Sequence, residues 1–337
     1  MRKLNILFRV SGGRAPGKEL GNGHIFRSIN LAHHFKKHNI LFLLEDYGGA
    51  KKILYENGFK NIIIIQKDIN LKNDINKTKK IIKNKKIDLL IHDVYKVKNE
   101  YLKHIKKYTK TILITDLKKF KYSADLVING FIGFKNQRIS LNDGRVRCLG
   151  PKYQILDNRF SKIKKIKKKY ELLVTFGGFD ENNLTELFIE QLIKSKIKTK
   201  TRIIHGPSSK KTNEIKKLEK KHPKSFTIIP FGDMYKEMSL AKFGLCSGGI
   251  TTYEFATLGI PFAIISQLTH QTITAKVWED AGIAINLGLN NKTTGQKIAS
   301  FLENINTIQL KKNTNKHLNL NGNGGTIVYE EIMKLLD

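Results

Sequence analysis

The 337-residue sequence contains few cysteines, prolines and tryptophans, with 2, 6 and 1 respectively. No stretch approaches the ~18 consecutive apolar residues that a membrane span requires, so we expect no integral span. Cys148 and Cys246 are too few for a disulfide framework or a four-ligand zinc site. We therefore expect reduced thiols in a cytoplasmic protein. The apolar stretch Leu4–Val10 is too short for a signal peptide, because Ser11-Gly12-Gly13 interrupts it, and it predicts a first strand.

Acidic residues are scarce, since 29 Asp+Glu face 61 Lys+Arg and give a net charge of +32. Only 9 of these cations are Arg and 52 are Lys. Nucleic-acid-binding proteins favour Arg, whose planar fork pairs with phosphates and guanine edges, so we expect no nucleic-acid partner. Lysines scattered among Asn and Ile, as in Thr78–Lys86, are typical of the solvated face of an amphipathic helix. Attraction of anionic small molecules or peripheral contact with an acidic membrane is the alternative interpretation. The oligomeric state is not determined by the sequence.

Short apolar runs alternate with amphipathic helical patterns along the whole chain. Several runs are almost continuous Ile, Leu and Val, which is typical of a parallel sheet covered on both faces. The alternation predicts the α/β class with open, doubly wound sheets. The predicted strands are Leu4–Val10, Ile40–Leu44, Ile62–Ile65, Ile87–Ile91, Thr111–Ile114, Leu126–Ile128, Leu172–Phe176, Lys200–Ile204, Phe226–Ile229, Phe243–Cys246, Phe262–Ile265 and Ala284–Leu287. The predicted helices include Ile25–Lys37, Ala50–Asn57, Asn73–Lys85, Thr251–Leu258, Thr272–Asp280, Gly295–Asn304 and Thr326–Leu336.

The pattern restarts after a charged stretch at Ser161–Lys169, which we interpret as a linker or a short exposed helix. The sequence thus predicts two α/β domains, residues 1–155 and 156–337, each of ordinary domain size. Ligands of open α/β folds bind outside the carboxyl ends of the parallel strands. We therefore expect a ligand-binding cleft between the two domains.

A long glycine-containing loop, Ser11–His24, follows the first predicted strand. The loop is too long for a dinucleotide fingerprint and Gly21-Asn22-Gly23 is not followed by its third glycine, which argues against an NAD site. His24 lies at a predicted helix start, where free amides and the helix dipole disfavour a cationic imidazole. A neutral imidazole can act as a general base. A histidine that only caps the helix fits the sequence equally well.

Two Gly-Gly turns follow strands in the second half of the chain, at Thr175–Asp180 and Cys246–Glu254. The backbone amides of such turns can bind phosphate. In the second turn, Ser247 and Thr251 can donate to phosphate oxygens and the glutamate can accept from sugar hydroxyls, so we favour a phosphate site there. For Gly177-Gly178, close packing of a helix on a strand is an equally strong interpretation.

Together these motifs resemble those of the PseG/SpsG family, which comprises UDP-sugar hydrolases of the pseudaminic acid pathway and their spore-coat relatives. The segment Gly21–Arg27 is similar to the N-terminal signature of the family. The segment Ser247–Glu254 also resembles the nucleotide-binding segment of MurG-like glycosyltransferases. Further matches occur in the same order over nearly the whole chain, at Asp93–Tyr95, Asp116-Leu117, Ala124–Asn129, Gly150–Tyr153, Arg159-Phe160, Phe176–Asp180 and Asn183–Thr185.

The resemblance implies a GT-B fold, in which two Rossmann-like domains have the active site between them. It implies removal of UDP from UDP-2,4-diacetamido-2,4,6-trideoxy-β-L-altropyranose or a related sugar. His24 would be the base that activates water for attack at C1. Asp93, Tyr95 and Asp116 are further catalytic candidates, which would orient His24 or hold acetamido and hydroxyl groups.

The resemblance also implies binding residues in both domains. The nucleotide-binding candidates are Gly177, Gly178, Ser247, Gly248, Gly249, Ile250, Thr251 and Glu254, with the last on the ribose. The sugar-binding candidates are Gly23, Arg27, Gln267, His270 and Gln271. No cofactor and no metal are expected, because the sequence has no Asp-x-Asp triplet of the kind that holds Mg²⁺ or Mn²⁺ on a nucleotide sugar.

Three features depart from the family pattern and leave the identity of the sugar open. The insert Arg14–Leu20 lengthens the loop before His24, Thr115 stands where an aspartate is common, and His270 stands where an amide side chain is expected. Two other functions fit the sequence. One is a MurG-type glycosyltransferase that uses a lipid or protein acceptor, and the other is a binding protein without catalysis.

Overall fold

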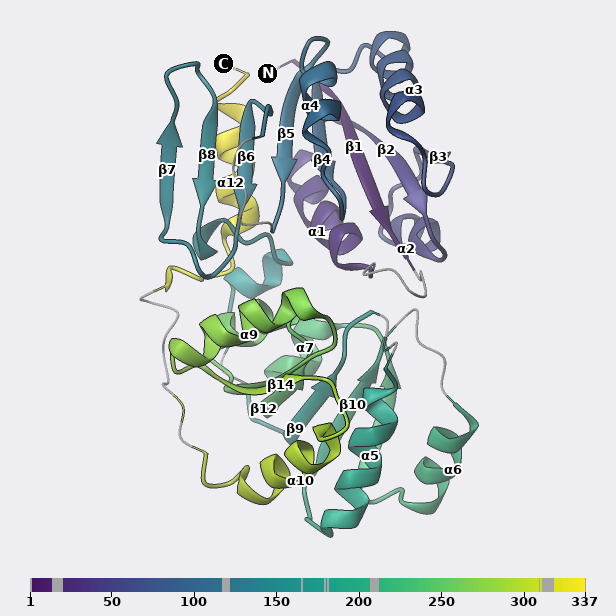
Figure 1. Ribbon diagram of the computed structural model, residues 1–337, viewed down its shortest axis with the longest axis vertical. Coiled ribbons are helices and arrows are strands. Elements are labelled where there is room, and N and C mark those ends of the chain that lie inside the picture. Colours follow the sequence, from purple (N-terminus) through teal and green to yellow (C-terminus); the bar gives the residue numbers. More distant parts are fainter. Residues whose placement is uncertain are drawn as a thin grey trace. The chain divides into compact units, whose positions relative to one another are not determined.

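The structure is a computed structural model, which describes residues 2–13, 21–116, 122–164, 166–178, 180, 182–206, 212–308, 310 and 318–336 (Figure 1). The chain divides into two compact units. The first comprises Met1–Asn158 and Gly322–Asp337, and the second comprises Arg159–Asn321. Each unit is built around its own β-sheet.

Within the described residues, the first unit has eight strands in the order β3-β2-β1-β4-β5-β6-β8-β7. All neighbouring pairs are parallel except β7 and β8, which form an antiparallel hairpin at one edge. The strands span Asn5–Gly12 (β1), Asn39–Asp46 (β2), Ile62–Ile65 (β3), Leu89–Asp93 (β4), Lys110–Ile114 (β5), Leu126–Asn129 (β6), Gln137–Ser140 (β7) and Val146–Leu149 (β8). The central strands are buried on both faces, as their continuous apolar composition requires.

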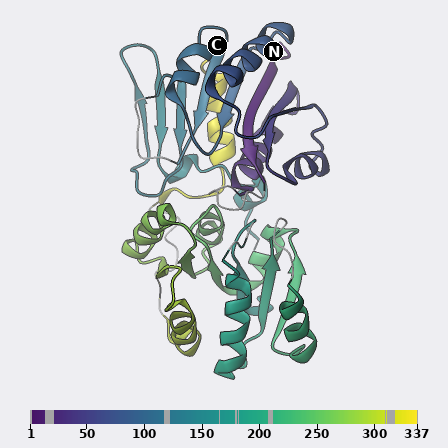
Figure 2. The ribbon, with the colours of Figure 1, turned by 45° about the vertical axis from the view of Figure 1, so that its right-hand side comes forward.

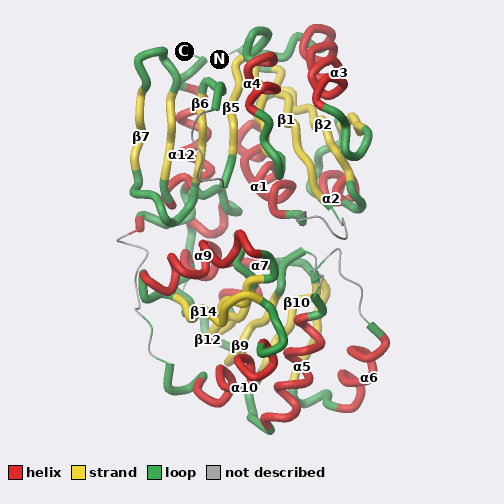
Figure 3. Tube along the Cα trace, in the orientation of Figure 1, coloured by secondary structure: helices red, strands yellow, loops and turns green. Residues whose placement is uncertain are grey.

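Helices cover both faces of this sheet (Figures 1 and 3). One face packs against α1 (Gly23–Ala32), α2 (Ala50–Glu56) and α12 (Gly324–Met333), with Ile29, Leu54 and Val328 among the buried contacts. The other face packs against α3 (Leu71–Asn84) and α4 (Asn99–Ile105). Short 3₁₀ helices at His33–Phe35 (η1) and Pro151–Tyr153 (η2) complete the unit.

The C-terminal helix α12 belongs to the first unit, which corrects the prediction that residues 156–337 form one domain (Figure 2). Tyr329 contacts Phe35 with a centroid separation of 4.9 Å, and Glu331 accepts a hydrogen bond from Arg138 of β7 at 2.7 Å. An added Cβ at Gly324 would lie 2.0 Å from the carbonyl oxygen of Gln154. The apolar face of α12 is therefore buried only by joining the first sheet, although the preceding helix in the chain belongs to the second.

The second unit has a six-stranded parallel sheet within the described residues, in the order β11-β10-β9-β12-β13-β14. Its strands are Tyr170–Thr175 (β9), Thr201–His205 (β10), Phe226–Pro230 (β11), Ala241–Cys246 (β12), Phe262–Ser266 (β13) and Ala284–Leu289 (β14). Its helices are α5 (Leu184–Ser195), α6 (Asn213–Lys221), α7 (Met234–Ser239), α8 (Thr251–Thr257), α9 (Thr269–Asp280) and α10 (Thr294–Asn304). This strand order is that of a doubly wound Rossmann-like sheet.

Opposite faces of the second sheet have different packing. Helices α5, α6 and α10 bury Phe188, Ile215 and Phe301 against one face. On the other face, Trp278 of α9 is fully buried and packs edge-on against Tyr253 and Phe262. Helices thus pack on both faces of the second sheet. The carboxyl ends of its strands, and the turns that follow them, lie between these two helical layers.

The charged stretch Ser161–Lys169 is not a helix over its described residues. A 3₁₀ turn, η3 (Asn158–Ser161), precedes it, and the rest has no regular structure. No helix among the residues that the structure describes combines the length and apolarity needed to cross a membrane.

We expect Gly324→Ala to destabilise the protein by about 1–3 kcal/mol, because the added methyl group would overlap the Gln154 backbone. Chemical denaturation measured by circular dichroism provides the test. Gly232→Ala is the control, since the nearest atom to its added Cβ is 3.9 Å away. Equal stability of the two variants would contradict the packing of α12 described above.

Candidate active site

The first group of candidate residues lies where α1 begins. The amide of Gly13 donates to the carbonyl of Gly21 at 3.3 Å, which brings together the ends of the loop between them. The predicted insert Arg14–Leu20 lies outside the described residues. Helix α1 starts at Gly23, so His24 occupies its first turn, where the sequence predicted it. An added Cβ at Gly23 would meet no described atom within 4 Å, so the space beside this turn is open.

Asp93, the last residue of β4, is fully buried and faces this turn. Its Oδ1 lies 2.7 Å from Nδ1 of His24. Arg27, one turn further along α1, donates from Nε to Oδ2 at 2.9 Å and from Nη2 to Oδ1 at 2.7 Å. Both oxygens of the buried carboxylate are thus held by the start of α1.

Arg27 also binds Asp116, which follows β5. Its Nη1 donates to Oδ1 and Oδ2 of Asp116 at 2.7 and 2.8 Å. The side chain of Asp116 is 53% exposed, whereas that of Arg27 is 6% exposed. The structure therefore brings four predicted residues together, and we refer to His24, Arg27, Asp93 and Asp116 as the His24 cluster. Arg27 was predicted to bind sugar, but its donors are directed at the two carboxylates, so we propose a positioning role for it.

The charges of the cluster stabilise one another. Burial would raise the pKa of Asp93, but Arg27 and His24 outweigh burial and hold that pKa below its ordinary range. Burial would lower the pKa of Arg27, but the carboxylates of Asp116 and Asp93 raise it above its ordinary value. Asp93 is therefore an anion over the whole physiological pH range, and Arg27 remains a cation.

The hydrogen bonds also fix the orientation of the His24 ring. Nη2 of Arg27 lies 3.2 Å from Nδ1, but the 2.7 Å contact with Asp93 is shorter. This network favours a proton on Nδ1, donated to Asp93, and a lone pair on Nε2. The ring is 19% exposed. A buried carboxylate that orients a partly exposed imidazole is the usual arrangement of a general base.

Tyr95 lies two residues beyond Asp93, in the loop after β4. Its amide donates to Oγ of Ser11 at 3.5 Å, which joins this loop to the end of β1. Its half-buried position places it at the same edge of the sheet as Asp93. A role in catalysis stays a prediction.

The second group of candidates surrounds the turn after β12. Gln267, which follows β13, donates from Nε2 to Oγ of Ser247 at 2.8 Å and to the carbonyl of Phe176 at 2.9 Å. One amide side chain thus joins the turn after β12 to the turn after β9. Its own backbone amide donates to Oε1 of Gln271 at 2.8 Å, so α9 fixes the position of Gln267.

The two glycines of this turn differ in their surroundings. An added Cβ at Gly248 would lie 2.8 Å from Cβ of Gln271 and 3.0 Å from its carbonyl oxygen, so no side chain fits there. An added Cβ at Gly249 would meet no described atom within 4 Å. The turn is therefore tightly packed on the side of α9 and open at Gly249.

The remaining candidate residues of the second unit lie on or directly before α8 and α9. Ile250 immediately precedes α8, and Thr251 is its buried first residue. Glu254 is one turn into α8, close enough to Cys246 that its charge adds to the effect of burial in raising the pKa of that thiol. His270 is the exposed second residue of α9.

Part of the glycine-rich motif in the turn after β9 has a structural role. Gly177 has a φ of 83°. The carboxylate of Asp180 accepts hydrogen bonds from the amides of Leu184 and Thr185 at 2.9 and 2.8 Å, so it caps α5. An added Cβ at Gly206 would lie 2.1 Å from the Gly177 carbonyl, which shows close packing against the end of β10. A nucleotide-binding role for Gly177 and Gly178 stays a prediction.

Comparison with known proteins places the chain in a family. A search of protein-family models gives no match. An uncharacterized protein of Methanocaldococcus jannaschii is 32% identical over 74% of this chain, which spans only 54% of that protein. The spore coat polysaccharide biosynthesis protein SpsG of Bacillus subtilis is 30% identical, and the match covers 81% of both chains. The chain belongs to the SpsG family.

Solved structures establish the fold of this SpsG-family chain. MurG of Acinetobacter baumannii superposes with a TM-score of 0.66, covering 98% of this chain and 99% of that one at 16% identity. MnaA of S. aureus, solved as a co-structure with UDP, gives a TM-score of 0.60 at 11% identity and covers 99% and 97% of the two chains. The SpsG-family chain has the α/β fold of the GT-B enzymes, with two Rossmann-like domains, as the resemblance implied.

Sequence reasoning missed a second buried network in the first unit of the SpsG-family chain. Arg9 of β1 is 2% exposed and donates to Asp74 at 3.2 and 3.0 Å and to Glu45 at 2.9 Å. His92 is buried beside it, and burial together with the charge of Arg9 lowers the pKa of His92 to about 3. The available signal was a lone arginine inside the apolar stretch Leu4–Val10. This network lies on the face of α3 and α4, opposite the His24 cluster.

Among the residues that the structure describes, no group of three or more His, Cys, Asp or Glu side chains is arranged to hold a metal ion. His34 and His38, four residues apart in the sequence, are both half-buried. The ring of His34 stacks on Tyr329 at 6.1 Å, and Nδ1 of His38 accepts the amide of Leu4 at 3.1 Å.

The low pKa of Asp93 predicts how the stability of the SpsG-family chain depends on pH. Because this pKa is depressed by folding, the carboxylate stabilises the protein above its unfolded pKa of about 3.9, and the contribution is lost on acidification. We expect Asp93→Asn to reduce the free energy of unfolding at pH 7, and the difference from wild type to narrow below about pH 4.

Urea denaturation of both proteins at pH 7, 4 and 3 provides the measurement. Asp280→Asn is the control, since this exposed carboxylate pairs with Lys276 on the surface of α9 and its loss should change stability little at any pH. A constant difference between wild type and Asp93→Asn from pH 7 to pH 3 would refute the assigned charge state.

Proposed function

We propose that the chain is a nucleotide-sugar hydrolase, which releases UDP from a UDP-linked diacetamido-trideoxyhexose in the synthesis of a pseudaminic-type acid. At a coarser level, we propose an enzyme that acts on a UDP-sugar in polysaccharide biosynthesis. The observation that carries the proposal is the 2.7 Å hydrogen bond between His24 and the buried Asp93 at the start of α1. The family resemblance assigns the base to this position.

The proposed reaction needs a general base and a site for the leaving group. It proceeds without a covalent enzyme intermediate. The lone pair on Nε2 of His24 accepts a proton from water as the water oxygen bonds to C1 of the sugar. The bond between C1 and the diphosphate oxygen breaks, and UDP leaves with the electron pair. The Nδ1–H group of the resulting imidazolium donates a hydrogen bond to Asp93, whose buried negative charge stabilises the imidazolium. Arg27 keeps Asp93 ionised and fixed in place.

The leaving diphosphate is assigned to the turn after β12. Ser247 and the amides around Gly249 supply donors there, and the absence of described atoms beside Gly249 leaves room for a ligand. Preformed donors of this kind stabilise charge that develops on a leaving group. Ile250 and Thr251 continue the turn into α8, and Glu254 is assigned to the ribose hydroxyls. This assignment requires no metal ion.

The sugar is assigned to residues at the edges of both turns. Asp116 presents a half-exposed carboxylate that Arg27 holds in place, and it is suited to accept hydrogen bonds from hydroxyl or acetamido groups. Gln271 and His270, at the start of α9, are the candidates beside the diphosphate turn. The Nε2 of Gln267 is committed to Ser247 and Phe176, so we propose that this side chain shapes the turn.

The comparisons support the coarser form of the proposal. The name of the Bacillus subtilis relative places that protein in spore coat polysaccharide biosynthesis, and MnaA was solved with UDP. A UDP-sugar substrate for this chain agrees with both. The hydrolytic outcome rests on the family resemblance, which assigns the base to His24.

We expect His24→Ala to lower the rate of UDP release by about 100-fold or more, with little effect on UDP affinity, because a general base acts only in the chemical step. The assay measures UDP by chromatography, without acceptor or added metal. The substrates are the UDP-linked diacetamido-trideoxyaltrose and UDP-N-acetylglucosamine.

His222→Ala is the matched control, because His222 lies at the end of α6 in the second unit. It should retain wild-type turnover. Turnover by His24→Ala equal to that of wild type would remove the base assignment. UDP binding without release from either substrate would indicate a transferase that needs an acceptor, or a different sugar.

We expect Glu254→Ala to weaken UDP binding by about tenfold, as the loss of a charge-assisted hydrogen bond to a ribose hydroxyl would. Isothermal titration calorimetry with UDP provides the measurement. Glu303→Ala, at an exposed position of α10, is the control. Unchanged UDP affinity in Glu254→Ala would contradict the ribose assignment.

A further inference from the structure

A second concave site lies at the opposite edge of the first sheet from the His24 cluster. Asp93 ends β4 and Asp116 follows β5, whereas this site is formed where strands of the same sheet begin. It is bordered by the segment that joins α4 to β5, by Ser123 before β6, and by the β7–β8 hairpin. The five residues of β5 alone separate the two edges by about 16 Å.

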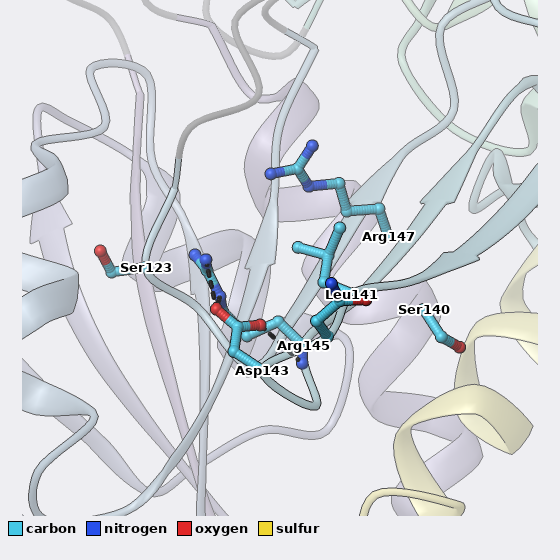
Figure 4. A pocket seen from close by; sticks show the side chains of 7 residues that line it. Ser123, Ser140, Leu141, Asp143, Arg145 and Arg147 are labelled. Carbon is cyan, nitrogen blue, oxygen red and sulfur yellow. Dashed lines mark hydrogen bonds and ion pairs between the residues drawn. The ribbon is translucent and has the colours of Figure 1, made fainter.

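The site consists of two adjoining hollows with volumes of about 640 and 510 Å³, which share Ser123, Asp143 and Arg145. Volumes of this size are typical of sites for small molecules. The first hollow is lined by the hairpin and by Arg147 (Figure 4). The second extends to the basic residues at the end of α4, which are Lys103, His104, Lys106 and Lys107.

Within the hollows, Arg145 is fixed and neutralised. Its Nε donates to Oδ2 of Asp143 at 2.7 Å and its Nη1 donates to the carbonyl of Tyr122 at 2.8 Å. The hydrogen bond lowers the pKa of Asp143 and raises that of Arg145, so both groups stay charged and their charges cancel. Asp143 is therefore engaged by its own hairpin and is the one acidic residue among those that line the hollows.

Arg147 differs from Arg145 because no described residue pairs with it. It lies on β8, is half-buried, and its guanidinium receives none of the dashed contacts that join Arg145 to Asp143 (Figure 4). A guanidinium in a partly desolvated hollow gains from an anionic partner more than an exposed lysine does. Its planar fork suits the paired oxygens of a phosphate group.

The lysines at the end of α4 extend the positive field. Cations at a helix C-terminus are favoured by the helix dipole, which accounts for Lys103 on its own. That effect does not account for Arg147, which reaches the hollow from a strand, or for Lys107, which lies beyond the helix. Lys106 lies 4.0 Å from Asp125, so the excess positive charge comes from the remaining cations.

We propose that this site binds a small soluble anion bearing a phosphate or diphosphate group, held by Arg147 with Lys103 and Lys107. The site is separate from the one assigned to the UDP-sugar and does not depend on the proposed hydrolase activity. Three separate segments at one edge of the sheet border the site, so it suits a compact ligand better than an extended one. Binding should weaken as ionic strength rises, because the partners are charges near the surface.

Titration calorimetry of the full-length protein with inorganic diphosphate tests the proposal, in the presence of saturating UDP to occupy any nucleotide site. We expect wild type to bind diphosphate and Arg147→Gln to bind it about tenfold more weakly. Lys103→Gln/Lys107→Gln, at exposed positions, should also weaken binding and guards against misfolding of the strand variant. Lys216→Gln/Lys217→Gln, on α6, removes the same charge elsewhere as a control.

Three results would overturn the proposal. One is the absence of diphosphate binding by wild type at low salt. Another is an equal loss of affinity in the α6 control, which would show a general effect of net charge. The last is binding only to vesicles of phosphatidylglycerol and not to soluble diphosphate, which would show a surface for lipid headgroups in place of a small-molecule site.

Discussion

The arrangement of the first unit around its candidate site depends on the pairing of Arg27 with two carboxylates. An isolated charge buried in a protein is costly, and removal of one partner from a buried pair is strongly destabilising. The burial of the Arg27 charge is tolerated because Asp93 and Asp116, at the ends of two different strands, both accept hydrogen bonds from it. The same pairing links α1, β4 and β5 at one point. The orientation of His24 follows from it, because the oxygen of Asp93 that contacts the imidazole is also held by Arg27.

A second buried arginine occupies the other face of the same sheet. Arg9 is held by Asp74 of α3 and Glu45 of β2, close to the neutral His92. His92 and Asp93 are consecutive residues of β4, so their side chains point to opposite faces. The carboxyl end of β4 is therefore held by charged networks on both sides. Such networks restrict the backbone at the place where the candidate base and its carboxylate must keep their geometry.

Much of the fold could be predicted from the sequence, because buried parallel strands have nearly continuous Ile, Leu and Val. Ile62–Ile65 was located to the residue, and most other predicted strands differ from the structure by one or two residues at an end. The β7–β8 hairpin was not predicted, since Gln137–Ser140 is a polar edge strand. The location of α12 was also beyond sequence reasoning. An amphipathic helix shows which face is buried, but the pattern does not say which sheet buries it.

The candidate site was predictable in part, through the family resemblance that grouped His24 with Asp93 and Asp116. The contacts agree with it, because the carboxyl ends of β4 and β5 meet at one edge of a parallel sheet. The orientation of the Arg27 side chain could not be predicted. Arg27 is three residues after His24 and shares its helix face, but this spacing does not determine whether the guanidinium contacts substrate or protein. The capping of α5 by Asp180 was hidden by its place in a glycine-rich motif. Local hydrogen bonds of this kind have no sequence signal beyond residue type.

The return of the chain to the first unit has a consequence for folding during synthesis. The second unit is a continuous segment, Arg159–Asn321, and all of its strands and helices are made before α12. The first sheet is complete much earlier, yet the apolar surface that Val328 and Ile332 cover stays without its helix until α12 is made. The second unit can therefore fold completely on the ribosome before α12 is available to complete the first unit. The first unit, which carries the His24 cluster, is therefore completed only after the second unit has been made.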